Sequence, residues 1–152
     1  MCVFRVSSKN TSFKLFIDNN PELPVYRLHE KGEQPEIGNE ESTYEDYGFC
    51  CDVSDRDWCD VEGQIIDMIS FLEVYSYILE KLKQTHDIDD WRFDLPYECT
   101  LNKKDFSQFN YLPPQLIKLA GELGIGIELS MYWPSQEDAQ EDEISADSDT
   151  DD

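Results

Sequence analysis

The 152-residue sequence has few basic residues. Its 12 lysines and arginines stand against 34 aspartates and glutamates, which gives a formal net charge of −22. A surface with this charge repels nucleic acid and anionic membranes, so neither is expected as a partner. The same electric field speeds association with cationic surfaces. A basic protein is therefore the partner that the composition predicts.

The sequence also lacks CxxC pairs, and it has no long apolar run of the kind that spans a membrane. No apolar segment typical of an export signal follows the N-terminal Met1. The five cysteines are an odd number, which disfavours a complete set of disulfides. We therefore expect a cytoplasmic protein with free thiols.

Motifs of known catalytic chemistry are missing. There is no GxGxxG, GxxxxGK or HExxH, and the two histidines, His29 and His86, stand in no nucleophile motif. We predict no catalytic residue and no cofactor, so the chain is not expected to be an enzyme. The alternative is a small-molecule-binding or enzymatic domain of unknown reaction, with a pocket lined by Trp91, Tyr97 and Tyr132.

The length fits one domain, which we predict over residues 1–134. Residues 135–152 hold nine acidic side chains, no basic one and little apolar surface. Such a segment cannot bury enough apolar area to offset the entropy of ordering, so we predict a disordered acidic tail.

Hydrophobic periodicity predicts the elements. Strands are expected at 2–7, 25–32, 47–54, 91–98 and 125–132, a short extra strand at 106–111, and helices at 13–17, 61–82 and 114–123. The element order predicts an α+β fold with a largely antiparallel sheet and helices on one face. Its order is ferredoxin-like, βαββαβ, with a C-terminal αβ unit.

The apolar positions of these strands predict which side chains face the core. Tyr26 and Leu28 are expected to face inward, as are Leu129 and Met131 near the C-terminus. Pro96 cannot donate to a β-ladder, which predicts an edge strand or a bulge at that position.

The segment GFCCDVSDRDWCD, residues 48–60, resembles a metal site in composition. Cys50 and Cys51 are adjacent, however, and adjacent strand residues point to opposite faces, so they cannot chelate one ion together. Asp55, Asp57 and Asp60 come just before a long helix, where carboxylates cap free N–H groups. No metal site is predicted, and a carboxylate-bound divalent cation stays open as an alternative.

A second acidic segment, residues 87–98, places acids where a calcium loop would have them. Arg92 occupies the position where that loop needs glycine, and the segment alternates like a strand. We interpret this match as accidental.

Four stretches carry a resemblance to a known family: MCVFRVSS, YRLHEKGE, DVSDRDW and, above all, YLPPQLIKLAGELGIGIELSMYWP. They resemble a family of small bacterial proteins filed as a domain of unknown function, some members of which are described as immunity proteins of polymorphic toxin systems. The resemblance spans residues 1–134. It implies an immunity function and no catalytic residues.

The charge and the resemblance together predict a non-catalytic intracellular binding protein that neutralises a basic toxin or another basic partner. Two surfaces are candidates, an acidic rim before the long helix and the polar face of the sheet. The predicted partner-binding residues are Asp52, Asp55, Asp57, Trp58, Asp60, Asp94 and Glu128. Two alternatives stay open: the charge serves solubility alone, or the chain oligomerises through an exposed strand edge.

Overall fold

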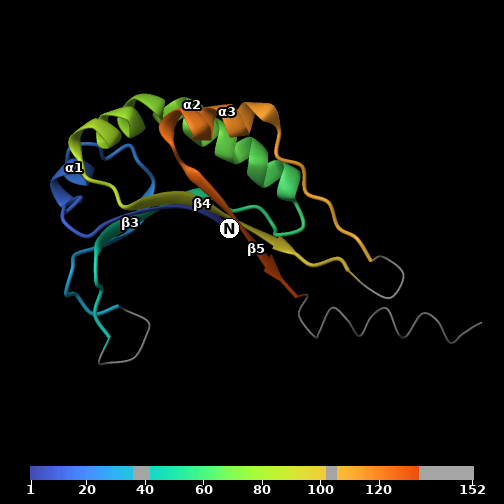
Figure 1. The fold of residues 1–152 in the computed structure, drawn as a ribbon, viewed down its shortest axis with the longest axis horizontal. Helices are drawn as coiled ribbons and strands as arrows, with labels where there is room; N and C mark the ends of the chain where they lie inside the picture. The colour runs from blue at the N-terminus through green and yellow to red at the C-terminus, as the bar shows by residue number, and fades with distance from the viewer. Residues whose placement is uncertain (36–41, 102–105, 134–152) are drawn as a thin grey trace, which may run out of the picture.

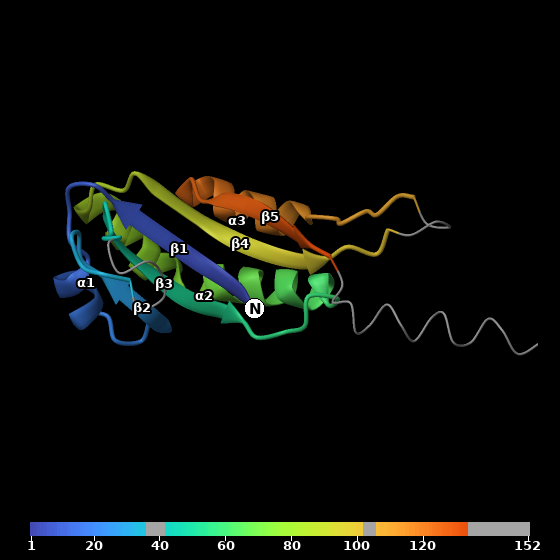
Figure 2. The same cartoon turned by 90° about the horizontal axis from the view of Figure 1, so that it is seen from below.

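The computed structural model describes residues 1–35, 42–101 and 106–133, which form a five-stranded mixed sheet and three helices. In chain order the elements are β1 (Cys2–Ser8), α1 (Lys14–Asp18), β2 (Val25–His29), β3 (Tyr47–Ser54), α2 (Val61–Thr85), β4 (Asp90–Glu98), α3 (Pro114–Leu123) and β5 (Gly126–Tyr132). The helices lie on one side of the sheet (Figure 1), and no described helix covers the other side (Figure 2). The predicted α+β class is confirmed. The predicted acidic tail lies outside the described residues.

The strands are ordered β2-β3-β1-β4-β5. Strand β5 pairs parallel with β4, and the other three pairings are antiparallel. The sheet is therefore mixed, and its order does not by itself confirm the predicted ferredoxin-like arrangement. Strands β2 and β5 are the two edges.

The core forms where α2 packs on the sheet. The helix predicted over 61–82 buries a stripe of apolar side chains, at Ile65, Met68, Leu72, Leu79 and Leu82. Burying side chains of this size stabilises the fold by about 1.5–3 kcal/mol each. No described helix is long and apolar enough to cross a membrane.

Aromatic rings fill the space between β1, β4 and α2. The ring of Phe4 lies 5.2 Å from that of Phe93 and 5.5 Å from that of Phe71. Pairs at this distance add about 0.5–1.5 kcal/mol beyond their burial. Because these side chains come from three elements, the cluster holds α2 against the centre of the sheet.

Strand β2 departs from its prediction. It ends at His29, and the register shifts between Val25 and Arg27. A bulge places two consecutive side chains on one face, so Tyr26 lies on the open face with Arg27 instead of in the core. Leu28 faces inward, as predicted.

The C-terminal part of the sheet differs from the prediction in three ways. The predicted short strand at 106–111 is wrong, since these residues are irregular. Strand β4 is an internal strand and not an edge. It tolerates Pro96 because its pairing with β1 ends at Asp94, so the missing N–H of Pro96 interrupts no β1–β4 hydrogen bond. Leu129 and Met131 do face the helix side but are 46% and 51% exposed, because none of the described helices extends over the end of β5.

Candidate protein-binding surface

The predicted acidic rim lies on the segment between β3 and α2. Asp60 is the N-cap of α2, and its Oδ1 accepts a hydrogen bond from Gly63 N at 2.9 Å. Asp57 caps the preceding turn instead, since it accepts from Cys59 N at 2.9 Å. Asp55 is exposed. The capping prediction is therefore confirmed for the helix at Asp60 alone.

Trp58 joins this rim to the sheet. Its indole is 40% exposed and stacks on the Tyr132 ring, with centroids 4.5 Å apart and planes 28° apart. Its carbonyl accepts from Glu98 N at 3.4 Å. The rim and the polar sheet face, two separate candidates in the sequence, are thus continuous at the ends of β4 and β5.

Asp57, Cys59 and Glu98 form a cluster whose ligand atoms lie within 4.8 Å of one another. The Cys59 thiol donates to Glu98 Oε2 at 3.0 Å, and this hydrogen bond raises the pKa of the thiol to about 12. The Cys59 backbone N–H lowers the pKa of Asp57. At neutral pH the cluster holds a protonated thiol between carboxylates, and this exposed grouping alone does not assign a metal.

The predicted acids on the open face differ in availability. Asp94 is buried and accepts from Arg5 at 2.5 Å and from Ser130 at 2.6 Å. Glu128 lies 3.1 Å from Arg92 Nε. Asp52 is exposed and has no ion pair among the described residues. Asp94 therefore positions neighbouring side chains, whereas Asp52 and the half-exposed Glu128 are accessible to a partner.

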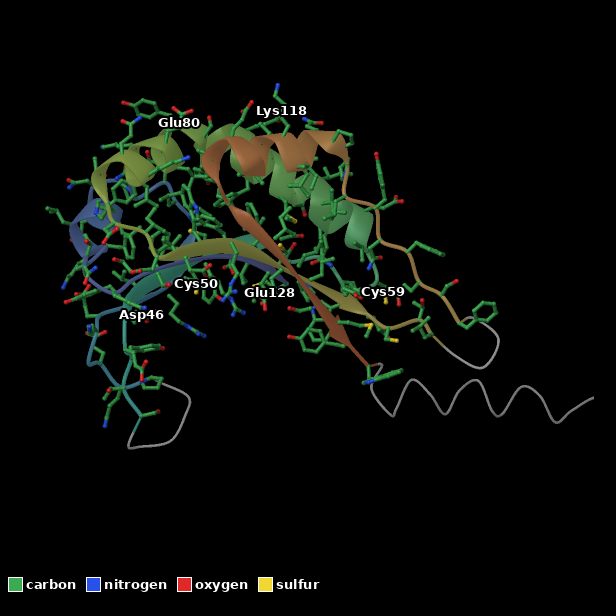
Figure 3. The ribbon with its side chains drawn as sticks, viewed as in Figure 1. Asp46, Cys50, Cys59, Glu80, Lys118 and Glu128 are labelled. Carbon is green, nitrogen blue, oxygen red and sulfur yellow. The ribbon has the colours of Figure 1, made fainter. Side chains whose placement is uncertain are left out.

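The sheet register also builds an arginine row that the sequence did not reveal. Arg27 pairs in register with Cys50, Cys50 with Arg5, and Arg5 with Arg92. Figure 3 shows Cys50 and Glu128 on the side of the sheet away from the helices. Burial raises the pKa of the Cys50 thiol, although Arg27 and Arg5 oppose the shift. The polar alternation of each strand was visible in the sequence, but the pairing that lines up the arginines was not.

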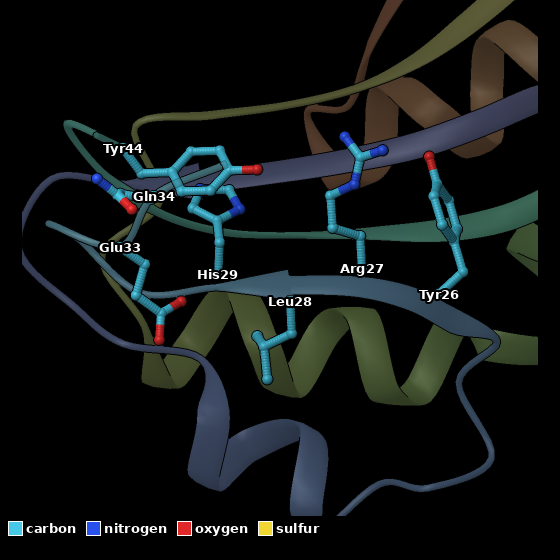
Figure 4. Close-up of a pocket in the computed structure, with 7 residues that line it drawn as sticks. All are labelled: Tyr26, Arg27, Leu28, His29, Glu33, Gln34 and Tyr44. Atoms are coloured by element: carbon cyan, nitrogen blue, oxygen red, sulfur yellow. The ribbon is translucent and has the colours of Figure 1, made fainter. Parts of the chain in front are cut away.

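A hollow of about 590 Å³ lies beside β2. Its polar lining is Tyr26, Arg27, His29, Glu33, Gln34 and Tyr44. In Figure 4 the Tyr44 ring covers His29, and the two rings stack with centroids 3.8 Å apart. His29 Nε2 also lies 3.2 Å from Asp46 Oδ1, so contacts with neighbouring side chains already engage the imidazole.

The predicted small-molecule pocket does not form. Trp91 is buried on the helix side, where its indole N–H donates to Gly124 O at 2.9 Å. Tyr132 lies on the opposite face, in register with Glu98. Because Trp91 and Tyr132 lie on opposite faces of the sheet, they cannot line one cavity.

Exposed aromatic side chains lie near Trp58, because Trp58 stacks on Tyr132 and the loop before α3 contacts both Glu98 and the first turns of α2. We call this surface the aromatic end, and it consists of Trp58, Phe106, Phe109, Tyr111, Tyr132 and Trp133. Phe106 and Phe109 are each 89% exposed. Gln108 fixes the loop to the end of β4 by donating to Glu98 O at 2.8 Å. Sequence periodicity missed this surface because it read residues 106–111 as a strand.

A shallow apolar hollow of about 300 Å³ adjoins the aromatic end. It lies between the first turns of α2 and the loop before α3, and its apolar lining is Val61, Ile65, Ile66, Phe109, Tyr111 and Pro113. Glu62 lies at its border. The neighbouring Arg56 is engaged by Asp60 at 3.0 Å and by Asp67 at 2.8 Å, so among the described residues it forms no ion pair with Asp57 or Glu98.

No family model matches the chain, and neither a curated protein nor a solved structure is significantly similar to it. The family resemblance noted in the sequence therefore stays a prediction.

Proposed function

We propose that the chain is a non-catalytic protein-binding module that recognises a basic protein through the aromatic end and its carboxylates. The observation that carries the proposal is the exposed, stacked Trp58–Tyr132 pair beside Asp57 and Glu98. Stacking holds both rings in place before a partner arrives, which lowers the entropy cost of binding.

The chemistry of this surface suits a cationic protein partner. Tryptophan and tyrosine are enriched among the residues that contribute most to protein interfaces, and exposed apolar patches mark such sites. Asp55, Asp57 and Glu98 would attract lysine and arginine, and the aromatic faces bind such cations by cation–π contact. The net charge of −22 adds long-range steering toward a basic surface.

Within this class, we propose an intracellular immunity protein that blocks a basic toxin. The acidic surface supports this, and so does the family resemblance in the sequence. The described histidines favour binding over catalysis. His86 stacks on Phe13 and meets the Phe16 ring edge to face, and burial lowers its pKa. His29 is engaged by Tyr44 and Asp46.

Small-molecule binding is the second candidate. The hollow beside β2 favours it, because Arg27 lines that hollow and makes no ion pair with another described residue. An uncompensated guanidinium in so acidic a chain would bind a small anion there.

We also propose that β1 to β4, with α1 and α2, constitute a ferredoxin-like unit. The element order and the antiparallel pairings of β1 with β3 and β4 support it. Strand β5 would then be an addition that extends this unit at the β4 edge.

Co-expression with the product of the adjacent gene tests the function. We expect binding that weakens steeply with salt and a loss of at least about tenfold in affinity for Trp58→Ala, the size expected for a major interface residue. Tyr77→Ala is the matched control, because Tyr77 is an exposed aromatic residue on α2. A partner that binds equally well to the Trp58 variant, or without salt dependence, would contradict the proposal.

A further inference from the structure

Strand β5 leaves one side of the sheet open. Among the described residues it pairs with β4 alone, over seven residues without a register shift. Edge strands are ordinarily blunted by bulges, prolines, lysines or a covering segment. The seven residues of β5, GIELSMY, contain no proline and no basic residue. A regular edge of this kind is a template for another strand.

The direction of the free backbone groups follows from one hydrogen bond. Cys99 N donates to Tyr132 O at 2.7 Å, on the β4 side. The N–H and C=O groups of successive strand residues point alternately to the two sides of the strand. The outward groups are therefore those of Ile127, Leu129 and Met131.

The two faces of this edge differ in chemistry. On the helix side, the half-exposed Leu129 and Met131 present apolar surface. On the open face, Glu128 is half-exposed and lies 3.1 Å from Arg92 Nε, and Tyr132 pairs in register with Glu98. An added strand would meet apolar side chains on one face and carboxylates on the other.

We propose that β5 accepts an extended segment of a basic protein as a sixth strand, with apolar side chains over Leu129 and Met131 and lysines or arginines over Glu128 and Glu98. The segment pairs with the outward backbone groups of Ile127, Leu129 and Met131, as in strand-addition recognition. This inference rests on the proposed function and names how the basic partner is held.

The charge of the chain favours a basic segment over a second copy of the chain as the strand that pairs with β5. Two copies, each with a net charge of −22, repel, and β5 would bring the carboxylates of both to one interface. A segment that alternates apolar and basic residues satisfies both faces of the edge at once. It also continues directly into the aromatic end, where Trp58 stacks on Tyr132.

The test uses the full ¹⁵N-labelled chain and a synthetic seven-residue peptide with blocked ends in which lysine and valine alternate. A peptide of the same composition with its valines grouped is the control for charge alone, and an alternating glutamate and valine peptide is the control for the sign of the charge. We expect the alternating basic peptide to bind about tenfold more tightly than the grouped one. The grouped peptide would lose one to two backbone hydrogen bonds and an apolar contact, which corresponds to a difference of this size.

Amide hydrogen exchange identifies the edge. In the free chain the amides of Ile127, Leu129 and Met131 should exchange fast, and the alternating peptide should slow all three. The change Met131→Pro removes one outward donor, and Met131→Ala removes the side chain but keeps that donor. We expect the proline variant to bind the peptide about fivefold more weakly than the alanine variant, the equivalent of one hydrogen bond.

The outcomes separate this inference from the proposed function. Binding without slower exchange at the three amides overturns the added strand but leaves a basic partner in place. If neither basic peptide binds, the added strand is overturned, and the proposed function fails with it only if the adjacent gene product also does not bind. Protection of the three amides in the free chain would assign the edge to a second copy if the chain is dimeric, or to the chain itself if it is monomeric, and both results overturn the inference.

Discussion

The two edges of the sheet are built differently. Strand β2 has five residues, a register shift and the charged Arg27, and the chain after it folds back through a backbone hydrogen bond of 2.9 Å from Gly32 N to Tyr44 O. Strand β5 has seven residues in regular register and no such segment among the described residues. Among the described residues, one edge is blunted against further pairing and the other is unpaired, which is why the proposed interaction surface lies at the β5 side.

Beside the β2 edge, Gly48 of β3, which pairs with His29 of β2, should not tolerate a larger residue. A Cβ there would lie 2.4 Å from His29 Cε1 and 2.9 Å from the Val6 carbonyl oxygen, so Gly48→Ala forces the imidazole and the strand apart. Overpacking of this kind costs about 1–3 kcal/mol, measurable by urea unfolding. Gly121→Ala is the control, because nothing lies within 4 Å of its Cβ and alanine favours the helix. Equal stability of the Gly48 variant and the wild type would contradict this account of the edge.

The β5 edge should distinguish inward from outward backbone groups. Ser130→Pro removes an N–H that points toward β4, so we expect the free energy of unfolding to fall by about 0.5–1.5 kcal/mol relative to Ser130→Ala. Met131→Pro removes an outward N–H and should cost less, relative to Met131→Ala. Thermal unfolding of the four variants measures both differences. A larger loss at Met131 would reverse the assignment of the free edge.

A single charge should blunt the β5 edge without harming the fold. Met131 is half-exposed, so Met131→Lys should change stability by no more than about 0.5 kcal/mol. The added lysine should nevertheless weaken binding of the basic peptide, because it places a like charge at the edge. Met131→Gln is the uncharged control. Unfolding curves and peptide titration at low and high salt separate the two effects.

The smallest effect is expected at the β2 end, where His86 packs on Phe13 and Phe16 of the α1 region. Burial lowers the pKa of His86 below its ordinary value of 6.5. The unfolded chain therefore binds the proton more readily, and stability falls as the pH drops through about 6.5 toward the lower folded pKa. Urea unfolding between about pH 7.5 and 5.5 should show this slope. In the variant His86→Gln, the free energy of unfolding should depend less on pH. If the slope is unchanged in this variant, groups other than His86 cause the pH dependence.

Part of the fold was predictable because it depends on local sequence. The apolar stripe of α2, the strand alternation around Phe49 and Cys51, and the cap at Asp60 follow from neighbouring residues. The predictions were wrong where contacts between residues distant in the sequence decide which way a side chain faces or whether it is covered. Tyr26 lies within a bulge in the pairing of β2 with β3. Leu129 and Met131 alternate like core residues, yet no helix in the described part of the chain extends over them.

The candidate site was predictable in its parts but not in its assembly. The sequence alone determined a chain that is strongly acidic, has an α+β element order and carries a cluster of aspartates and Trp58 before a long helix, because composition and periodicity are local properties. Only the tertiary structure decided that Trp58 stacks on Tyr132, that Glu98 meets Cys59 and that β5 is the last strand at one side of the sheet. Strand order and register depend on which distant residues pack together, and no local pattern records that choice.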